Sequence, residues 1–588
     1  MADEVRQQTD TQAQERAQGR LGPQLNQMIR ALWASPVRTA LLLLGVGVWV
    51  IVIATAYGQI RLNRWNQPFY DALSRRDLRG FLLQLIVFAL IAGSLLALNV
   101  ALKWLGEMLK LKLREGLVDD LLGEWLQPRR AFRLANGGTI GVNPDQRMHE
   151  DARHLTELSS DLGIGLLQAS ILLITFVKVL WDISTGFGFQ IGARLLTIPG
   201  YMVWAAILYA GSASLLSYWV GRNLINANAE RYAREADLRF SLVRVSEHID
   251  SISLAGGEAD ELRRLKIDLG AVLKATRRLV TGLTNLTWIT SGYGWFTIVA
   301  PILVAAPIYF DARISFGGLM MAAGAFTQVQ SSLRWFVDNF STIADWRATL
   351  LRVASFRRAL LDSHEMHGSA DQIQIGEGPA GKFVIDRLEI ASPNGATMLQ
   401  EPHIELKAGE HVLIVGENGA GKTLLFRALA GLWPWGSGSV TRPKDEQMRY
   451  MPRTAYLPPG SLREVLAYPA GVAEFGDDKY ARALQRMQLE RLIPLLDESK
   501  RWDQELNEDE QQQVAFARMV LQAPPWLLVD EVFESLDEPT LTKLKDVFAN
   551  ELKQTGLIHI GRNPQSGPPY ARVLHLVNDP TLRRLTRA

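Results

Sequence analysis

The sequence contains no cysteine among its 588 residues. This absence excludes disulfide bonds, thiolate metal sites and cysteine nucleophiles. A surplus of either charge is also missing, because 63 Lys and Arg against 61 Asp and Glu give a formal net charge of +2. The bulk electrostatics therefore give no support to a nucleic-acid partner, and we expect none. The length exceeds that of one ordinary domain and predicts about two to four of them.

The first segment, residues 1–21, lacks an apolar run and is polar and charged. It does not have the form of a cleavable signal peptide, and we expect a polar N-terminal tail. In residues 22–360 long apolar runs alternate with basic segments, whereas residues 381–588 have the composition of a water-soluble domain. We expect residues 361–380 to form the linker between these two domains.

Six stretches of residues 22–360 approach the roughly 20 apolar residues that a helix needs to cross a bilayer. Two of them contain LLLLGVGVWVIVIATAY and GWFTIVAPILVAAPIYF, which carry no charge. Buried helices of a large water-soluble protein are therefore the weaker interpretation, and we predict a six-span helical membrane domain. The predicted spans are Thr39–Ile60, Phe81–Leu105, Leu162–Leu180, Leu195–Val220, Leu286–Tyr309 and Phe316–Val337.

Lys and Arg are concentrated in the two long segments between the second and third spans and between the fourth and fifth. The loops after the third and fifth spans are short and nearly free of them. The positive-inside bias therefore predicts that both long segments and both termini are cytoplasmic. One loop departs from this pattern, because Arg61–Arg79 is predicted to be external and yet holds five arginines.

The second half opens with a glycine-rich loop. In HVLIVGENGAGKTLLFRALAGLWP an apolar strand is followed by a match to G-x-x-x-x-G-K-[ST] and by a helix that begins at Lys422. The backbone N–H groups of such a loop and the positive end of the helix hold phosphates, Lys422 adds a mobile cation, and Thr423 a hydroxyl ligand for Mg²⁺. The ATP-binding residues predicted here are Gly416, Glu417, Asn418, Gly419, Ala420, Gly421, Lys422 and Thr423.

WLLVDE supplies a second motif. Trp526–Val529 reads as a buried strand, and Asp530 emerges at its end to hold Mg²⁺ through water. Glu531 is then placed to orient or deprotonate the attacking water. The alternative to a functional role is that each carboxylate is an ordinary surface group at the end of a strand. We therefore predict ATP and Mg²⁺ as cofactors, Thr423 and Asp530 as metal ligands, and Lys422 and Glu531 as catalytic residues.

In order and spacing, GENGAGKT, EQQQVAFAR, WLLVDE and SLD resemble the nucleotide-binding domain of an ABC transporter. The segments LAGLWPWGSG, AYLPPGSLREVLAYP, NPDQR and SEHIDSISLAGGE are similar to those of one branch of this family. That branch fuses an SbmA/BacA-type membrane domain to its ATPase and is related to the peroxisomal ABCD half-transporters. The resemblance implies an α-helical six-span membrane domain plus an α/β P-loop NTPase domain, the ABC nucleotide-binding domain.

The resemblance also implies a half-transporter that dimerises, with each ATP between the phosphate loop of one subunit and the signature turn of the other. Asp537, in SLD, resembles the residue through which the two sites communicate. We expect a homodimer that spans the bilayer of the bacterial inner (plasma) membrane several times, with a cytoplasmic nucleotide-binding domain. The transported solutes implied are peptides or other bulky hydrophilic compounds such as cobalamin, and import and export remain equally open. A membrane nucleotide sensor without productive turnover and a fatty-acyl transporter are the alternatives.

The signature turn departs from the family's pattern. This branch usually has Leu-Ser-x-Gly-Glu-Gln-Gln, whereas residues 506–512 read LNEDEQQ. Asn507 can still donate a hydrogen bond to ATP through its side-chain amide. Asp509 brings a carboxylate close to a triphosphate, and their repulsion amounts to several kcal/mol at reduced dielectric.

Three other family positions also differ. Arg453 replaces a glutamine that senses Mg²⁺ and water, Arg562 replaces the switch histidine, and Ser392 lies near the position where many members stack an aromatic ring on adenine. His559, expected within a strand, is a weaker candidate for a displaced switch. Either Arg453 and Arg562 neutralise Asp509 or the γ-phosphate as an arginine finger does, or the site has drifted into a poor ATPase. Pairing with a different half-transporter is a third possibility, and we expect ATP to bind and to be hydrolysed slowly.

Overall fold

The computed structural model describes residues 21–136, 144–185, 188–191, 194–362, 372–379, 381–392, 395–565 and 567–579. It divides the chain into two compact units. The helical unit comprises Met1–Gly123 and Asn143–Arg357, and the sheet unit comprises Glu124–Val142 and Arg358–Ala588. Nearly all of the predicted polar tail and half of the predicted linker lie outside the described residues.

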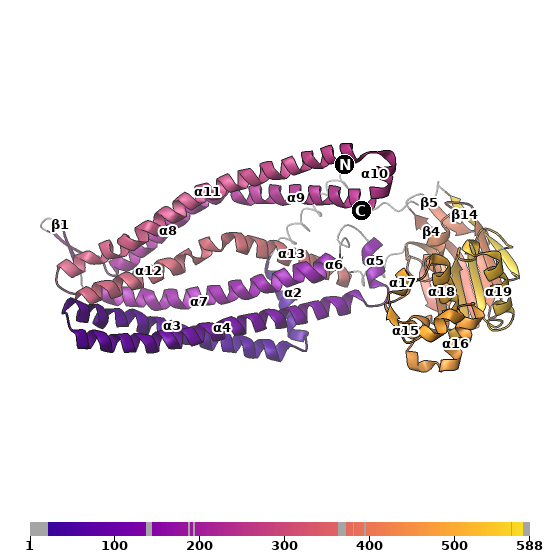
Figure 1. The fold of residues 1–588 in the computed structure, drawn as a ribbon, viewed down its shortest axis with the longest axis horizontal. Coiled ribbons are helices and arrows are strands. Elements are labelled where there is room, and N and C mark those ends of the chain that lie inside the picture. The colour runs from indigo at the N-terminus through magenta and orange to yellow at the C-terminus, as the bar shows by residue number, and fades with distance from the viewer. Residues whose placement is uncertain are drawn as a thin grey trace. The chain divides into compact units, whose positions relative to one another are not determined.

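Long helices build the helical unit (Figure 1). Five segments of the described chain are long and apolar enough to cross a membrane: Arg38–Ser74, Leu78–Trp125, Pro144–Ser184, Tyr201–Glu247 and Glu258–Phe310. The sixth predicted span coincides with a helix of 23 residues, α12. The helices are α2 (Leu21–Ala34), α3 (Arg38–Ser74), α4 (Leu78–Trp125), α6 (Pro144–Gln146), a π-helical turn (Arg147–Asp151), α7 (Ala152–Ser184), α8 (Tyr201–Gly221), α9 (Leu224–Glu247), α10 (Ile249–Ala255), α11 (Glu258–Phe310), α12 (Phe316–Asp338) and α13 (Phe340–Asp362).

Two local predictions about these helices are wrong. The fourth span does not begin at Leu195, because β2 (Arg194–Thr197) pairs there with β1 (Gly188–Ile191) in an antiparallel hairpin. α8 starts only at Tyr201, after a proline that lacks an N–H and after Gly200, whose φ of 67° is left-handed. The predicted external loop Arg61–Arg79 is also mostly helical, because α3 continues to Ser74 and α4 begins at Leu78.

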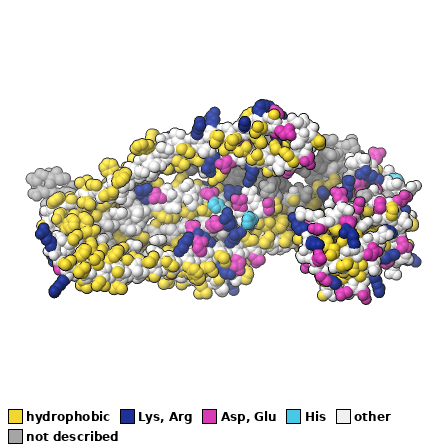
Figure 2. All heavy atoms as spheres, viewed as in Figure 1, with side chains coloured by type: hydrophobic (Ala, Val, Ile, Leu, Met, Phe, Trp, Pro, Cys, Tyr) yellow, Lys and Arg dark blue, Asp and Glu magenta, His cyan; other side chains and the backbone are white. Residues whose placement is uncertain are grey.

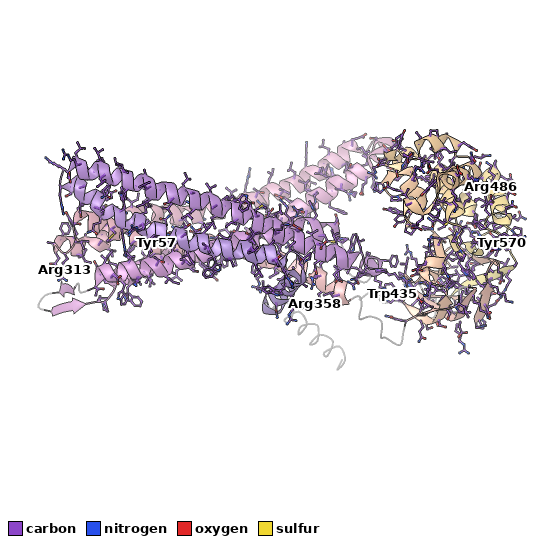
Figure 3. The ribbon with its side chains drawn as sticks, turned by 90° about the horizontal axis from the view of Figure 1, so that it is seen from below. Tyr57, Arg313, Arg358, Trp435, Arg486 and Tyr570 are labelled. Carbon is purple, nitrogen blue, oxygen red and sulfur yellow. The ribbon has the colours of Figure 1, made fainter. Side chains whose placement is uncertain are left out.

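The core of the helical unit lies around α12, which packs against α3, α7, α8 and α11. Its first turn is tied to α3, since Asp71 accepts hydrogen bonds from the Gly317 N–H and the Ser315 hydroxyl, both 2.8 Å long. Arg313, between α11 and α12, lies at the same end of this unit as the β1–β2 hairpin (Figure 3). Around that end the surface is largely hydrophobic, whereas charged side chains gather over the other half of the unit (Figure 2).

The sheet unit is built on ten strands in the order β3-β8-β4-β5-β14-β7-β13-β12-β9, with β6 paired to β4. β14, β7, β13, β12 and β9 are mutually parallel, and the pairs that join β4 to β5, β6 and β8 are antiparallel. The strands are β3 (Gln374–Glu377), β4 (Lys382–Ser392), β5 (Gly395–Leu399), β6 (His403–Lys407), β7 (His411–Gly416), β8 (Gly436–Arg442), β9 (Met448–Met451), β12 (Trp526–Asp530), β13 (Gly556–Gly561) and β14 (Arg572–Asp579).

Helices gather around these strands (Figure 1). Two clusters of buried apolar side chains hold them, one centred on α15, α16 and α18 and one between α14 and the sheet. This arrangement of parallel strands and helices confirms the predicted α/β domain. The helices are α14 (Lys422–Leu429), α15 (Leu462–Ala467), α16 (Asp477–Arg486), α17 (Trp502–Glu505), α18 (Glu508–Gln522) and α19 (Glu538–Ala549), and a small hairpin joins β10 (Gly460–Ser461) to β11 (Ser499–Lys500).

A short helix from the first half of the sequence, α5 (Arg130–Asn136), also belongs to the sheet unit. Arg129 lies 2.5 Å from Asp445, and the guanidinium of Arg427 lies 5.6 Å from the ring centre of Phe132. No motif in the sequence predicted these contacts, because they join residues about three hundred positions apart.

Candidate functional site

Three adjacent parallel strands bring the predicted site together. β7, β13 and β12 are neighbours in register, so their carboxyl ends at Gly416, Gly561 and Asp530 meet at one edge of the sheet. The residues that follow these ends include Lys422, Glu531 and Arg562. This edge is where ligands bind in open α/β sheets.

The loop after β7 needs its glycines. Gly419 and Gly421 have φ values of 86° and 91°, a region that glycine enters without strain. A Cβ on Gly421 would lie 2.3 Å from the Thr397 hydroxyl oxygen, so no side chain fits there. Thr397, in β5, donates a hydrogen bond of 3.1 Å to the carbonyl of Ala420 and supports the loop from below. The sequence did not mark Thr397, because one threonine in a strand carries no signal.

Lys422 and Glu531 form the centre of the site. The Lys422 Nζ donates to the carbonyl of Gly416 over 3.1 Å and lies 2.8 Å from Oε1 of Glu531. Both side chains are largely withdrawn from solvent, with 7% and 13% exposed. An ammonium fixed in this way between a carbonyl and a carboxylate is placed to meet an anion that arrives at the loop.

Glu531 has an unusual backbone and two cationic partners. Its φ of 51° is left-handed, and its N–H donates to the carbonyl of Ile560 over 2.8 Å. Arg562 donates to the carboxylate through Nε over 3.0 Å and through the terminal Nη2 over 3.2 Å. Burial favours the protonated acid, but the hydrogen bonds and charges of Arg562 and Lys422 prevail and lower the pKa of Glu531 to about 2.

Asp530 has the surroundings of a metal ligand. It ends β12 with 4% of its surface exposed, and the Thr423 hydroxyl is hydrogen-bonded to its carboxylate. Burial first, and then the neighbouring Glu531 carboxylate, raise the pKa of Asp530 to about 6. Its Oδ1 atom is buried without a hydrogen-bond partner. A Thr hydroxyl beside a carboxylate with an unused oxygen fits Mg²⁺, which prefers hard oxygen ligands.

The signature turn forms the start of α18. Asn507 is its N-cap, since Oδ1 accepts from the Glu510 N–H over 2.9 Å and the Glu510 carboxylate accepts from the Asn507 N–H over 3.3 Å. The cap uses the amide oxygen of Asn507, so its NH₂ group is not needed for the cap. Asp509 lies exposed in the first helical turn, where a carboxylate is favourable for the helix itself. LNEDE is therefore a sound helix start as well as an atypical signature.

Other predicted residues lie apart from the cluster of Lys422, Thr423, Asp530, Glu531 and Arg562, which we call the Lys422 cluster. Asp537 caps α19 by accepting from the Thr540 N–H over 3.3 Å. Arg453 is exposed, and its carbonyl accepts from the Gln512 side chain over 2.8 Å. Among the described residues, four predicted site residues form no hydrogen bond or ion pair with the Lys422 cluster: Asn507, Asp509, Asp537 and Arg453.

His559 lies inside β13, which confirms the prediction that it belongs to a strand. Its side chain is fully buried, with Nδ1 2.7 Å from the hydroxyl oxygen of Tyr570, which Figure 3 labels. A ring in the core cannot meet a nucleotide, so His559 is not a displaced switch. Ser392 is buried in β4 and donates to the carbonyl of Gly395 over 2.9 Å, and residues 393–394 lie outside the described chain. Glu534, which the sequence did not indicate, accepts from the Arg562 N–H over 2.5 Å.

Comparisons with known proteins identify the family to which both units are similar. The family model "ABC transporter transmembrane region 2" matches residues 28–310, and the model "ABC transporter" matches residues 399–534. The inner membrane ABC transporter ATP-binding protein YddA of Escherichia coli K12 is 26% identical over 91% of this chain and 94% of its own length. The chloroplastic ABC transporter D family member 2 of Arabidopsis thaliana is 27% identical over 84% and 77%. The lysosomal cobalamin transporter ABCD4 of Mus musculus is 23% identical over 86% and 87%.

The structure is also similar to that of a bacterial Atm1-family ABC exporter with ATP bound, with a TM-score of 0.69. The match covers 90% of this chain and 91% of the exporter at 17% sequence identity, and it shows the same fold. Lys422, Thr423, Asp530 and Glu531 thus lie within the residues that match the model "ABC transporter", whereas Arg562 follows them. Helices α3 to α11 lie within the residues that match the transmembrane model. The chain belongs to the ABC transporters: it is a half-transporter with fused membrane and ATP-binding domains, which couples ATP hydrolysis to transport.

Proposed function

We propose that two copies of this chain form a transporter of the bacterial inner membrane in which the Lys422 cluster binds and hydrolyses ATP. The observation that carries the proposal is the convergence of Lys422, Thr423, Asp530 and Glu531 at the ends of β7 and β12. The proposed catalytic residues are Lys422 and Glu531. Phosphates are held by the backbone of Gly416, Glu417, Asn418, Gly419, Ala420 and Gly421.

A bound Mg²⁺ would supply positive charge to neutralise the phosphates. Thr423 and Asp530 would hold it, because they are the oxygen donors beside the phosphate loop. Phosphate oxygens compete with Glu531 for the Lys422 ammonium, so ATP releases one of the two cations that hold the carboxylate. Arg562 stays paired with Glu531, which weakens this carboxylate as a base without removing it. This supports slow rather than absent turnover.

A second copy is proposed because, within one chain, the residues of the signature turn do not contact the Lys422 cluster. Asn507, Asp509 and Asp537 make none with the Lys422 cluster in the described residues. Asn507 has an amide to offer a γ-phosphate, and Asp537 is an exposed helix cap and so accessible to another subunit. The positive-inside bias of the sequence supports a cytoplasmic position for the nucleotide-binding domain.

For the transported solute we propose peptides or other bulky hydrophilic compounds such as cobalamin. The similarity to the lysosomal cobalamin transporter ABCD4 supports this class. A second candidate is a fatty-acyl compound, which an apolar cavity of about 600 Å³ in the helical unit favours.

The test is turnover and uptake by the full chain in proteoliposomes. We expect ATPase activity that falls by about 100-fold or more in Glu531→Gln, because a general base contributes that much, while ATP binding persists. Equal turnover in wild type and Glu531→Gln would contradict the assignment of the base. A panel of labelled peptides, cobalamin and fatty-acyl compounds then identifies the solute class, and ATP-dependent movement of the acyl compounds alone would contradict the hydrophilic proposal.

A further inference from the structure

The helical unit contains an apolar cavity of about 600 Å³ between α2, α4, α7, α12 and α13. α2 turns one face toward it, with Leu25, Met28, Ile29 and Leu32 at the spacing of an amphipathic helix. The remaining lining is also almost entirely hydrophobic. Neither the ATP site nor the predicted motifs use this cavity.

The few hydroxyls in the lining have their hydrogen bonds within the protein. Thr156 donates to the carbonyl of Arg153 over 2.8 Å, and Ser159 donates to that of Leu155 over 2.6 Å. Trp346 in turn donates to the Ser159 hydroxyl over 2.9 Å. The walls therefore give a polar molecule little to bind, and a lining of this composition favours an apolar occupant.

The dimensions of the cavity fit a chain rather than a compact ring. Its lining on α7 runs from Leu155 to Leu166, which is about 16 Å at 1.5 Å per residue. The rim is open and apolar, because Ile29, Leu166 and Phe336 are 54%, 52% and 57% exposed. An occupant can thus enter lengthwise from the apolar surroundings of the helices.

The position of the cavity selects the occupant. The cavity lies where two predicted spans meet the cytoplasmic side: Gly163 and Leu166 belong to the third span and Phe336 to the sixth, whereas Leu113 and Leu155 lie in the adjoining segment that is predicted to be cytoplasmic. On its outer side α2 exposes Arg30 and Trp33, residue types that anchor an amphipathic helix at the head-group level of a bilayer. A cavity lined by such a helix lies within reach of phospholipid acyl chains.

We propose that this cavity is a lipid site, which holds an acyl chain of a phospholipid from the surrounding bilayer. The bound chain completes the packing of α2 against α4 and α7. The assignment is independent of the ATP site, and it gives the cavity a resident lipid in place of the fatty-acyl solute that is the second candidate above.

Gly163 provides the test. It lines the cavity, and a Cβ placed on it meets nothing within 4 Å, so the side chain of Gly163→Phe can start there without strain and occupy part of the cavity. Gly165, two residues further on, is unsuitable because its Cβ would lie 2.8 Å from Nε1 of Trp335. Gly93, on the outer surface of α4, also has open space around it, and Gly93→Phe is the matched control.

Full-length wild type and both variants are purified in one detergent, and bound phospholipid is measured by native mass spectrometry and by extraction. We expect wild type and Gly93→Phe to retain a phospholipid on each chain and Gly163→Phe to lose it. Retention by Gly163→Phe, absence from wild type, or a free fatty acid in place of phospholipid would overturn the proposal. If Gly163→Phe does not fold, Ile29→Trp at the exposed rim replaces it, with the same loss expected.

Discussion

Arg562 holds the Glu531 carboxylate by both oxygens, with Nε 3.0 Å from Oε1 and Nη2 3.2 Å from Oε2. A guanidinium matches a carboxylate in this bidentate way, which makes the pair stronger than a single contact. Together with Lys422, and against the effect of burial, it lowers the pKa of Glu531 to about 2. A carboxylate with so low a pKa is a weak base. The residue at the position of the family's switch histidine therefore restrains the proposed base.

Arg562→Ala should accelerate ATP hydrolysis. Without the guanidinium the pKa of Glu531 rises toward the ordinary value of about 4.3, and base strength rises with it. We expect the turnover number at pH 7 to increase by roughly tenfold, because proton abstraction follows the strength of the base. The measurement is steady-state ATPase activity of the full chain in nanodiscs at saturating ATP.

The control for Arg562→Ala is Arg572→Ala, which removes another arginine of the sheet unit that pairs with a glutamate, Glu401, over 3.0 Å. Its turnover should equal that of wild type. A decrease in turnover in Arg562→Ala would show that Arg562 acts on the γ-phosphate as an arginine finger does, as one of the two sequence hypotheses states.

Local patterns made part of this site predictable. The glycine loop and WLLVDE are each read from consecutive residues, because their chemistry depends on a strand end and the turn after it. The pairing of Arg562 with Glu531 depends instead on β13 lying beside β12, and the support from Thr397 depends on where β5 lies. Neighbours of this kind are set by sheet order, which the residues of one segment do not specify.

In the membrane half, too, local sequence predicted the elements better than their ends or their neighbours. Apolar runs located the helices well, since five of the six predicted spans fall entirely within helices. The fourth failed at its start, because the apolar residues of β2 carry the same signal as the beginning of a helix. Periodicity also could not predict that α5 belongs to the sheet unit.

Asp509→Gly should increase the affinity for ATP. Asp509 is exposed near the start of α18, where the family has the glycine whose amide faces the γ-phosphate of the other subunit. Removal of its charge should lower the KM for ATP by about tenfold, which corresponds to 1.4 kcal/mol of relieved repulsion. The measurement is the ATP dependence of hydrolysis.

Glu508→Gly is the matched control for Asp509→Gly, because it removes one exposed carboxylate from the same helical turn. Its KM should stay near that of wild type. If Asp509→Gly leaves both KM and turnover unchanged, the compensation hypothesis is wrong and Asp509 is only a residue of a helix start.

Asp537 allows its two proposed roles to be separated. As N-cap of α19 it accepts from the Thr540 N–H over 3.3 Å, and Asp537→Ala should cost about 1 kcal/mol of stability. Asp537→Ser keeps a capping oxygen and should melt like wild type. If the residue also links two ATP sites, both variants should lower the Hill coefficient for ATP. A normal Hill coefficient in Asp537→Ser would restrict the residue to capping.

Acid stability should depend on His559. Burial lowers the pKa of His559 to about 3, whereas in the unfolded chain it is about 6.5. Between these values the unfolded state binds more protons, so the free energy of unfolding falls as the pH falls. From pH 7 to pH 5 this one side chain should cost about 2 kcal/mol.

His559→Phe removes the titrating group and keeps a ring beside Phe533 and Tyr570, whose ring centres lie 4.6 Å and 5.8 Å from that of His559. We expect its melting temperature to fall less between pH 7 and pH 5 than that of wild type, even if the lost hydrogen bond to Tyr570 lowers both values. His403→Gln, at an exposed histidine of β6 beside Asp386, should keep the wild-type slope. Equal slopes in wild type and His559→Phe would mean that acid destabilises the fold through another buried group. That group would not be Asp530, because its pKa is raised to about 6 and its protonation therefore stabilises the folded state as the pH falls.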